Sequence, residues 1–415
     1  MINIPKGTKD VLPNESYKWH EVERVVRTLK NRYNLKEIKT PMFEHTELFI
    51  RGVGKSSDIV NKEMYTFLDK GERSITLKPE GTAGVARSFI ENGLYNETMP
   101  LKTYYITQCF RYERPQAGRL RQHTQFGSEW FGVDSVEADA EILLMATDFY
   151  KAFGINPTVS INNLGCADCR KKYVEALKEY FKPHIINMCP DCGRRFETNP
   201  LRILDCKCDE CKEVTKHAPK ITEFLCSDCT TRFENLKTLL SKLGINYKEN
   251  SMLVRGLDYY TNLIFEFVDE DKKLGQNALG GGGRYNNLIE ELGGKPTPVV
   301  GFGLGIERLL LYLENKGIEV NNNEVLNVYV ANATNNLEEI VKITKLLRDN
   351  NISTEMNLTG RSLKAQFKYA DKIKAQNVLV VGDDELSSGN FTIKNLTSGE
   401  QTVVSKNQLI KYFKG

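Results

Sequence analysis

The sequence predicts an α+β protein in which an antiparallel sheet flanked by helices precedes a separate α/β domain. Two strand-like runs, LKTYYITQCFRYE (101–113) and QHTQFGSEWFGV (122–133), are separated by RPQAGRLR, whose proline, glycine and arginines suit an exposed hairpin loop. From residue 326 onward, short apolar segments alternate with amphipathic segments of helical spacing. The first pattern indicates antiparallel strands, and the second indicates a smaller α/β unit.

The other elements follow from spacing and turn residues, in chain order. Residues 15–35 place apolar side chains at helical spacing from Trp19 to Tyr33 and predict an amphipathic helix. Residues 75–92 combine a short strand with a helix that opens after Pro79. Three further segments are predicted: a strand over 253–268, the glycine cluster Gly280–Gly283, and GFGLGIER (301–308) leading into a helix.

Two changes of composition divide the chain, whose 415 residues exceed one ordinary core. A cysteine-rich window interrupts the core pattern and predicts an insertion over 166–245. Gly317 and the asparagines at 321–323 mark a linker. We therefore expect a main domain over 1–322 that carries the insertion, and an α/β domain over 326–415.

Composition places the chain among ordinary globular proteins, with 40% hydrophobic and 27% charged residues. We find no apolar run of membrane-spanning length and no secretory signal at the N-terminus, so we expect a cytoplasmic protein without membrane contact. The net charge of +3 requires any nucleic-acid surface to be a local patch.

The FRYER segment places Arg111 and Glu113 at the end of one strand, with Phe126 on the next. An enzyme that joins a carboxylate to the α-phosphate of ATP must bring two anions together, and a fixed guanidinium can bridge both. A nearby aromatic ring can stack on adenine. On its own, an arginine and a glutamate two residues apart on a strand are more often a surface ion pair.

The GFGLGIER segment spaces three glycines at alternate positions before Glu307 and Arg308. Such spacing lets a ligand or a neighbouring segment approach a strand closely. It is not the dinucleotide fingerprint, because the later glycine and the acidic residue about 20 positions on are missing. A packing strand followed by a helix is an equally good interpretation of this segment alone.

Taken together, these segments resemble motifs 2 and 3 of class II aminoacyl-tRNA synthetases, and Pro41 lies where that class has its motif 1 proline. Four more segments are similar to signature segments of the histidyl-tRNA synthetase subfamily: PKGTKDVLP, TLKPEGTAGVAR (76–87), VRGLDYYTN (254–262) and GGGGRYNNLIEELGG (280–294). The resemblance covers nearly the whole chain, although the cysteines of the insertion are not general to the family.

The resemblance implies a class II catalytic domain over 1–322, an anticodon-binding domain over 326–415, and a homodimer with Pro41 at its interface. It implies that histidine reacts with ATP to form histidyl-adenylate, with Mg²⁺ on the phosphates, and is then transferred to the 3′ end of tRNA(His). Two alternatives are a regulatory paralogue that binds histidine-pathway enzymes and a ligand sensor built on the same core.

The resemblance also implies roles for individual residues. Arg111 and Arg255 are the expected catalytic residues, placed on opposite sides of the α-phosphate. The expected histidine-binding residues are Glu80, Gly81, Thr82, Arg111, Gln125, Glu129, Arg255, Tyr259 and Tyr260. The expected ATP-binding residues are Arg111, Glu113, Phe126 and Arg308. A structural ion pair is the alternative for a buried glutamate, and a core aromatic pair is the alternative for the two tyrosines.

The sequence departs from the family at Asn262, where glycine is commoner. Asparagine tolerates a left-handed backbone better than other non-glycine residues, so the turn after Tyr260 is expected to survive.

The cysteines of the insertion form four CxxC pairs, at 166/169, 189/192, 208/211 and 226/229, with Cys206 beside them. In a reducing cytoplasm this spacing favours a structural zinc ion over disulfides. We predict ligands Cys189, Cys192, Cys226 and Cys229, with Cys208 and Cys211 as the alternative partners of the first pair. A module of free thiols without metal is the competing interpretation.

The segment GRSLKAQFKYADKIKA places Arg361, Lys364 and Lys368 on one helical face of the C-terminal domain. A solvated charged face is the ordinary interpretation. The position after a class II core resembles the anticodon-binding domain, so we predict that these residues contact tRNA, together with Arg119 of the hairpin loop.

Overall fold

The computed structural model describes residues 2–55, 57–115, 118–269 and 278–414. The chain divides into two compact units, residues 1–321 and 322–415. Each unit is described by itself below. Among the described residues, no helix is long and apolar enough to cross a membrane.

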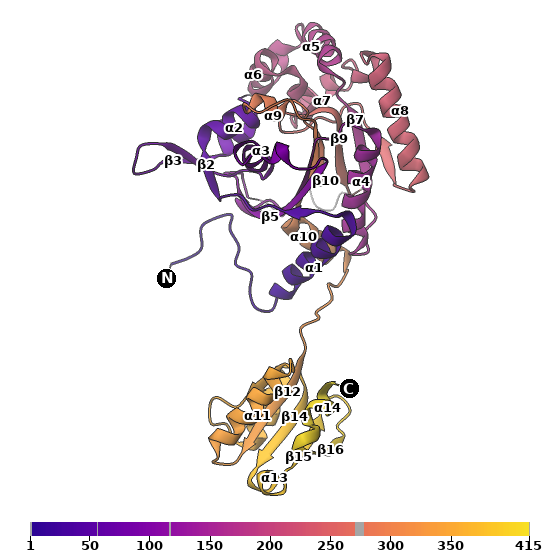
Figure 1. The fold of residues 1–415 in the computed structure, drawn as a ribbon. Helices are drawn as coiled ribbons and strands as arrows, with labels where there is room; N and C mark the ends of the chain where they lie inside the picture. Colours follow the sequence, from indigo (N-terminus) through magenta and orange to yellow (C-terminus); the bar gives the residue numbers. More distant parts are fainter. Residues whose placement is uncertain (1, 56, 116–117, 270–277, 415) are drawn as a thin grey trace. The chain divides into compact units, whose positions relative to one another are not determined.

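An eight-stranded sheet forms the centre of the first unit (Figure 1). Its strands, in order across the sheet, are β1 (Lys36–Glu37), β5 (Leu101–Phe110), β6 (Gln122–Phe131), β11 (Val299–Gly305), β10 (Ala278–Arg284), β9 (Thr261–Val268), β7 (Thr158–Asn163) and β8 (Tyr247–Glu249). The two outermost pairs are parallel and all the inner pairs are antiparallel. The predicted antiparallel sheet is therefore confirmed.

Helices cover both faces of this sheet. One face packs on α1 (Ser16–Tyr33), α4 (Val136–Lys151), α8 (Ser227–Lys242) and α10 (Ile306–Lys316) in a large apolar core. The other face packs on α3 (Thr82–Glu91) and α9 (Leu288–Glu291) in a smaller core that includes several tyrosines. Because successive residues of a strand point to opposite faces, one side of β6 is committed to the large core and the other side faces α3.

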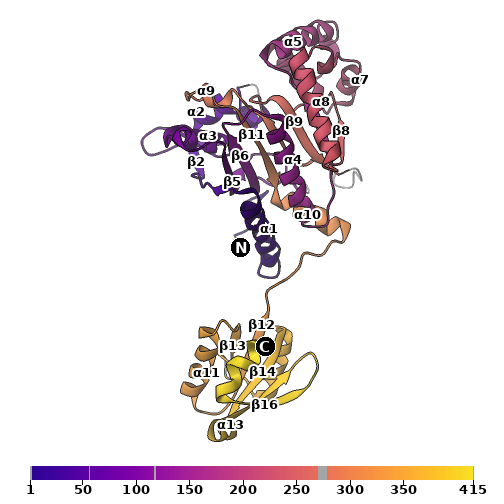
Figure 2. The same ribbon diagram turned by 45° about the vertical axis from the view of Figure 1, so that its right-hand side comes forward.

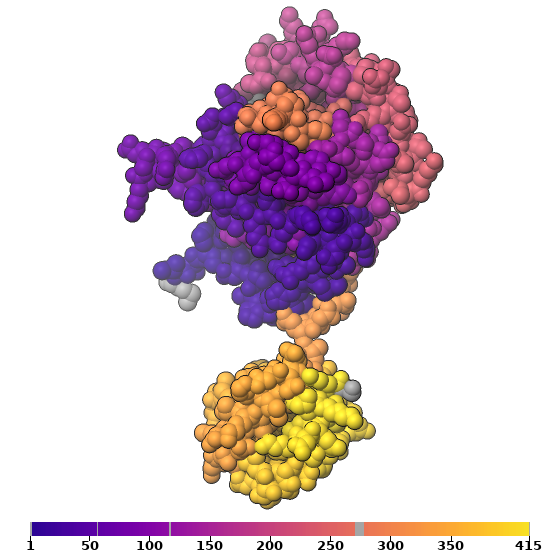
Figure 3. Space-filling model, viewed as in Figure 1, coloured from indigo at the N-terminus to yellow at the C-terminus, as the bar shows by residue number. Residues whose placement is uncertain are grey.

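A small sheet lies beside α2 (Thr46–Gly52) in Figure 1, and Figure 3 shows part of the chain projecting from the left of the first unit. The small sheet contains β2 (Phe43–His45), β4 (Ser74–Leu77) and β3 (Tyr65–Leu68), paired antiparallel in that order. Short helical turns connect other elements: η1 (Ile59–Glu63), η2 (Leu94–Asn96), η3 (Ile185–Asn187), η4 (Pro200–Asp205) and η5 (Ile221–Glu223) in this unit, and η6 (Lys406–Gln408) in the second.

The cysteine-rich segment forms a helical module between β7 and β8 (Figure 2). It contains α5 (Ala167–Phe181), α6 (Pro190–Thr198), α7 (Asp209–Thr215) and α8. The module has its own apolar core, in which Tyr173, Leu177 and Phe181 of α5 pack on Leu201 and Ile203. Its last helix, α8, also packs into the large core through Phe233, Leu236 and Leu240.

The strand predicted over 253–268 begins only at Thr261. Residues 253–260 form an irregular loop whose backbone bonds leave the sheet: Leu253 donates to the Asn250 carbonyl at 2.9 Å, and Asp258 donates to the Val53 carbonyl at 3.1 Å. Asn262 has a φ of 45°, so the asparagine does adopt the left-handed turn expected at this position.

The second unit is a five-stranded sheet with helices, as the alternating pattern predicts. Its elements are β12 (Leu326–Ala333), α11 (Leu337–Asp349), β13 (Thr354–Met356), α12 (Leu363–Lys372), β14 (Ala375–Gly382), α13 (Asp383–Ser388), β15 (Asn390–Asn395), β16 (Gln401–Ser405) and α14 (Leu409–Lys414). The strands β13, β12 and β14 run parallel, and β15 and β16 continue the sheet antiparallel.

Candidate active site

A cavity of about 710 Å³ lies on the face of the large sheet that α3 covers. It is lined by β6, the 253–260 loop, β10, β11 and the start of α10. Ten of the residues singled out from the sequence line it: Glu80, Thr82, Arg111, Glu113, Arg119, Gln125, Arg255, Tyr259, Tyr260 and Arg308. Segments about 230 residues apart in the chain thus contribute to one site.

Three arginines converge on this cavity, and each is held by a defined acceptor. Arg111 donates through Nε to the Pro79 carbonyl at 2.8 Å, Arg255 pairs with Glu266, and Arg308 donates to the Ala278 carbonyl. Burial disfavours the charge of Arg255, but Glu266 together with Tyr260 and Tyr259 outweighs it and raises the pKa of that guanidinium. Burial, reinforced by Arg119, lowers the pKa of Arg308. A cavity with three fixed cations is suited to a polyanionic ligand.

Glu113 lies among the arginines of the hairpin. Its carboxylate is 3.0 Å from Nε of Arg119 and 3.8 Å from Nη1 of Arg111. The ion pair considered from the sequence therefore exists, but all three residues line the cavity and the pair is not an isolated surface contact. Glu113 thus links Arg111 to Arg119 of the hairpin loop, and the Pro79 carbonyl orients Arg111.

The start of α3 supplies acceptors and donors at the floor of the cavity. Glu80 accepts hydrogen bonds from the backbone N–H groups of Thr82 at 2.8 Å and Ala83 at 2.7 Å, which are groups that a helix leaves unpaired at its N-terminus. Burial raises the pKa of Glu80 although these hydrogen bonds oppose the shift. The N–H of Gly81 donates to Oε1 of Gln125 at 2.9 Å, so that α3 and β6 hold each other in place.

Glu129 of β6 is fully buried next to the start of α3. Its Oε1 accepts from the hydroxyl groups of Thr82 at 2.8 Å and Tyr105 at 2.9 Å. Among the described residues, its Oε2 and the Tyr285 hydroxyl have no hydrogen-bond partner, and both point to the space above Gly301. Burial raises the pKa of Glu129 well above that of an ordinary carboxyl. An unpaired buried oxygen can accept a hydrogen bond from a buried N–H group.

Aromatic rings close the same pocket. The rings of Tyr259 and Tyr260 lie 4.7 Å apart, and the Tyr285 ring lies 5.2 Å from Tyr259 and 6.1 Å from Tyr260. Tyr285 was not singled out from the sequence, although it belongs to the quoted segment GGGGRYNNLIEELGG. Three tyrosine rings therefore pack against one another in the wall of the cavity.

The glycines of β11 make room for the side chains of β6. Gly301 lies opposite Glu129, and Gly305 lies opposite Gln125. A side chain at Gly301 would collide with Glu129 and Tyr285, and one at Gly303 would collide with Gln125. The close approach predicted from the alternating glycines is confirmed, and what approaches is the polar face of the neighbouring strand.

The expected role of Phe126 in stacking on ATP is wrong. Phe126 is fully buried in the large core on the far face of the sheet, where its ring lies 4.9 Å from Phe149 and 5.5 Å from Phe302. Strand alternation explains the error, because Gln125 and Glu129 face the cavity and the even-numbered residue must face away. His123 shares the parity of Gln125 and lines the cavity beside Arg111. Burial, together with Arg111 and Arg119, lowers the pKa of His123 to about 3, so its ring is neutral near pH ~7.

The cysteines of the insertion group differently from the predicted ligand set. Cys189 and Cys192 lie with Cys206 and Cys211, whereas Cys226 and Cys229 lie with Cys166 and Cys169. Cys208 is in neither group and donates to Glu210 at 2.7 Å. The predicted pairing of 189/192 with 226/229 is wrong because α5 and α8 begin side by side, which spacing along the chain does not reveal. The alternative prediction, which joined Cys208 and Cys211 to Cys189 and Cys192, is confirmed for Cys211 and wrong for Cys208.

The three basic residues of the second unit that were predicted to contact tRNA lie on or just before α12. Lys364 and Lys368 are exposed, while the Arg361 guanidinium lies 4.1 Å from the centre of the Tyr369 ring. A cation stacked on an aromatic ring keeps its N–H groups free to bind phosphate. The three side chains are therefore available to an anionic partner.

Other residues of the site were missed in the sequence. Tyr105 orients Glu129, Glu266 pairs with Arg255, and Glu307 holds β6 by accepting from the Thr124 N–H at 2.8 Å. Tyr105 and Glu266 each act on a predicted residue, and Glu307 acts on Thr124, the neighbour of the predicted Gln125. Only the order of strands in the sheet brings these pairs together, and that order is not readable from local spacing.

Two family models match the chain. The model for histidyl-tRNA synthetase matches residues 7–179 and 205–309, and the model for an anticodon-binding domain matches residues 322–415. The gap in the first match falls within the cysteine-rich module. The sheet, its arginine-lined cavity and the C-terminal unit thus define a class II aminoacyl-tRNA ligase.

Individual relatives narrow the assignment. The chain is 51% identical over 410 residues to the histidine–tRNA ligase of Clostridium novyi, covering 98% of this chain and 97% of the relative. It is 50% identical to the histidine–tRNA ligase of Caldanaerobacter subterraneus subsp. tengcongensis, with both chains fully covered. The crystal structure of apo Staphylococcus aureus histidyl-tRNA synthetase superposes over the full length of both chains with a TM-score of 0.86 at 40% identity. The chain belongs to the histidyl-tRNA synthetase family, and its function is that of a histidine–tRNA ligase.

Proposed function

We propose that the cavity beneath α3 joins the carboxylate of histidine to the α-phosphate of ATP. The observation that carries this proposal is the convergence of Arg111, Arg255 and Arg308 on one cavity that also holds buried acceptors. Two anions must meet in this reaction, and fixed guanidinium groups lower the repulsion between them and stabilise the charge of the transition state. Because these cations are already held by Pro79, Glu266 and Ala278, little reorganisation is needed when ATP binds.

The roles of individual residues follow from their positions. Arg111 and Arg255 act on the α-phosphate and the histidine carboxylate, and Arg308 binds the outer phosphates. Glu80, Gln125 and Thr82 surround the histidine amino group. The imidazole lies among Tyr259, Tyr260 and Glu129. A pocket with an unpaired buried oxygen selects a ring that carries an N–H group, because a ring without one leaves that oxygen unsatisfied.

ATP enters this reaction as its Mg²⁺ complex. Carboxylate oxygens are the ligands that Mg²⁺ prefers, and Glu113 and Glu266 present carboxylates to the cavity. The ion supplies charge neutralisation on the phosphates when it is bound. In place of Phe126, we assign the ring next to the nucleotide to His123, whose neutral imidazole lines the cavity beside Arg111.

The tRNA contacts are divided between the units. Arg119, at the entrance of the cavity, is placed to meet the acceptor end of tRNA(His), while Arg361, Lys364 and Lys368 bind phosphates of the anticodon region. The free cysteines and the composition support a reducing, cytoplasmic setting for this enzyme.

The enzyme acts as a homodimer. The segment after Pro41 exposes apolar side chains that an isolated chain has no reason to present to water: Met42 and Phe43, and Phe67 and Leu68 on the projecting hairpin. Leu68 is 67% exposed and Phe43 is 55% exposed. A second copy would cover this patch, since contiguous exposed apolar surface marks interaction sites.

Structural zinc in the insertion supports the fold of that module. Four sulfur atoms bound to one zinc ion lie about 3.8 Å from each other, because each Zn–S bond is about 2.3 Å long. In both cysteine groups the sulfur atoms lie within 4.8 Å of one another, and the Cys189 N–H donates to Sγ of Cys211 at 3.3 Å. These are the ligand type, number and spacing that a tetrathiolate site requires.

The experiment that tests the function is pyrophosphate exchange into ATP by the purified full-length chain. Exchange should require histidine and should not be supported by the other amino acids, including isosteric ones. Charging of tRNA(His) should follow in the same preparation. Exchange that proceeds equally well with another amino acid, or absence of exchange at saturating histidine, would contradict the assignment of the cavity.

A further inference from the structure

We propose that Cys166, Cys169, Cys226 and Cys229 bind a zinc ion that positions the histidine pocket from outside the cavity. The proposal rests on the function proposed above, since it concerns the same pocket. These four residues will be called the hinge cysteines, because they lie where the insertion leaves and re-enters the central sheet.

The position of the hinge cysteines is set by two helix starts. Cys166 immediately precedes α5 and Cys169 lies in its first turn, while Cys226 immediately precedes α8 and Cys229 lies in its first turn. A zinc ion at this place would fasten the first and last long helices of the module to each other. It would therefore fix the base of the module, three residues beyond the end of β7.

The distances fit a metal and not a disulfide. Sγ of Cys166 and Sγ of Cys169 are 3.5 Å apart, and all four sulfur atoms lie within 4.8 Å of one another. A disulfide would require about 2.05 Å, whereas a zinc tetrathiolate requires about 3.8 Å. The backbone N–H of Cys226 also donates to Sγ of Cys169 at 3.1 Å, a contact that orients a sulfur ligand from outside the metal shell.

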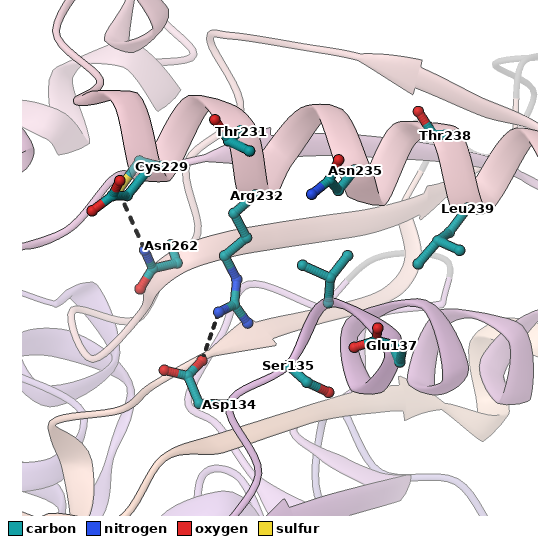
Figure 4. Close-up of a pocket in the computed structure, with 12 residues that line it drawn as sticks. Asp134, Ser135, Glu137, Cys229, Thr231, Arg232, Asn235, Thr238, Leu239 and Asn262 are labelled. Carbon is teal, nitrogen blue, oxygen red and sulfur yellow. Dashed lines mark hydrogen bonds and ion pairs between the residues drawn. The ribbon is translucent and has the colours of Figure 1, made fainter.

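The first connection to the histidine pocket runs through Asn262, whose contact with Cys229 is drawn in Figure 4. Its side-chain amide lies 3.9 Å from Sγ of Cys229. Its backbone is tied to the hinge as well, because its N–H donates to the Gly165 carbonyl at 3.1 Å and its carbonyl accepts from Leu164 at 2.7 Å. The side chain of Asn163 adds a further hydrogen bond in this region by donating to the Cys229 carbonyl at 3.0 Å. Asn262 follows Tyr260 by two residues, so its left-handed turn sets the path of the tyrosine loop.

The second connection runs through Arg170, one residue after Cys169. Nη1 of Arg170 donates to the Tyr260 carbonyl at 2.9 Å. Tyr260 is buried in the wall of the cavity against Tyr259. The start of α5 thus holds the backbone of a pocket residue directly, and a shift of that helix start would move the ring that closes on the imidazole.

The other cysteine group provides an internal comparison. Cys189, Cys192, Cys206 and Cys211 lie in the apolar core of the module, and Asp205 and Lys207 on either side of Cys206 line the cavity. Loss of that group should loosen the module as a whole and disturb the binding of both substrates. Loss of the hinge cysteines should act first on histidine binding, because their contacts lead to Asn262 and Tyr260.

The test compares single variants of the full-length chain by zinc content and by Michaelis constants in pyrophosphate exchange. The parent should hold about two zinc ions per chain. Cys226→Ser, at an exposed position where packing changes little, should lose about one of them and raise KM for histidine about tenfold while KM for ATP stays unchanged. Cys226→His supplies another zinc ligand and should restore both values. Cys208→Ser is the matched control outside both groups and should behave as the parent.

Arg170→Met separates the metal from its connection to the pocket. It should keep both zinc ions and still raise KM for histidine, which general unfolding of the module would not do selectively. If Cys226→Ser does not fold, removal of zinc from the parent by a thiol reagent with a chelator, followed by its return, should lower and restore histidine affinity. A parent without zinc, or a zinc-depleted enzyme with unchanged KM for histidine, overturns the proposal. Histidine-dependent exchange by the parent would still support the function of the cavity in either case.

Discussion

The two walls of the active-site cavity are built in different ways. One wall is β6, a strand of 10 residues that pairs with β5 on one side and β11 on the other and carries Gln125 and Glu129. The other wall is the 253–260 loop, which carries Arg255, Tyr259 and Tyr260 outside any strand. The sheet fixes the first wall, whereas the second depends on side-chain contacts.

Those contacts come from three different places. Glu266 of β9 holds Arg255, Arg170 of the insertion holds the Tyr260 carbonyl, and Asn199 of the insertion donates to Asp258 at 2.9 Å. A substitution on β6 should therefore change a single side chain of the cavity. A substitution in the insertion should shift the backbone of the 253–260 loop. We therefore expect the rigid wall to supply the hydrogen-bond acceptor for the imidazole through Glu129, and the loop wall to supply the tyrosine rings around it and the guanidinium of Arg255.

The largest expected effect is on the loop wall. Arg255→Ala removes a charge that acts on the α-phosphate mainly in the transition state, so exchange should fall by on the order of 10²–10³. The melting temperature should change little, because the neighbouring Glu266 is only partly buried. Pyrophosphate exchange at saturating substrates measures the effect, and Arg255→Lys, which keeps a positive charge at the same position, is the matched comparison. Activity close to that of the parent would remove Arg255 from the catalytic residues.

The second prediction asks whether the two walls suffice for histidine activation. A chain cut after Asn321 keeps every group of the cavity but loses Arg361, Lys364 and Lys368. It should retain exchange and lose most charging of tRNA(His). If each of the three residues contacts one phosphate of a single-stranded loop, a full-length Arg361→Ala, Lys364→Ala, Lys368→Ala variant should flatten the slope of log affinity against log salt by about 2. If the truncated chain and the triple variant both bound tRNA with the affinity of the parent, Arg361, Lys364 and Lys368 would be surface residues that do not contact tRNA.

The third prediction concerns recognition on the strand wall. Glu129→Gln keeps an acceptor for Thr82 and Tyr105 but removes a carboxyl group that can become charged when the imidazole binds as proposed, so KM for histidine should rise about tenfold while KM for ATP changes little. The difference in KM for histidine between the parent and Glu129→Gln should become smaller at low pH, because a protonated Glu129 is uncharged like glutamine. Steady-state exchange at several pH values measures both effects.

The same substitution should stabilise the enzyme without substrate. Burial raises the pKa of Glu129, so the folded state holds this proton more tightly than the unfolded state and loses stability as pH rises above the ordinary carboxyl value. Glutamine carries no such penalty. The gain in the free energy of unfolding should be absent near about pH 4 and grow toward neutral pH. A variant that is less stable and binds both substrates poorly would instead mark Glu129 as a structural residue.

The contrast between the walls also explains what the sequence could predict. The antiparallel pair β5 and β6, the alternating domain after residue 326 and the close approach at the glycines of β11 follow from local spacing. The loop wall was predicted only by resemblance, and its backbone was taken for a strand. The cysteine grouping and the contacts of Tyr105 and Glu266 depend on which elements become neighbours, so they required the structure.

The smallest expected effect separates the two faces of β6. Phe126 packs in the large core, so Phe126→Leu should lower the free energy of unfolding by about 1–2 kcal/mol and leave KM for ATP unchanged. His123 faces the cavity, so His123→Ala should raise KM for ATP about fivefold, as expected for a ring that stacks on a base, with little loss of stability. Because the pKa of His123 is about 3, its own titration should not contribute to the pH dependence of KM for ATP between about pH 6 and 8. Chemical denaturation and exchange kinetics measure the two variants side by side. If Phe126→Leu raised KM for ATP and His123→Ala did not, the strand would present its even-numbered side chains to the nucleotide, and the assignment of recognition to the rigid wall would fail with it.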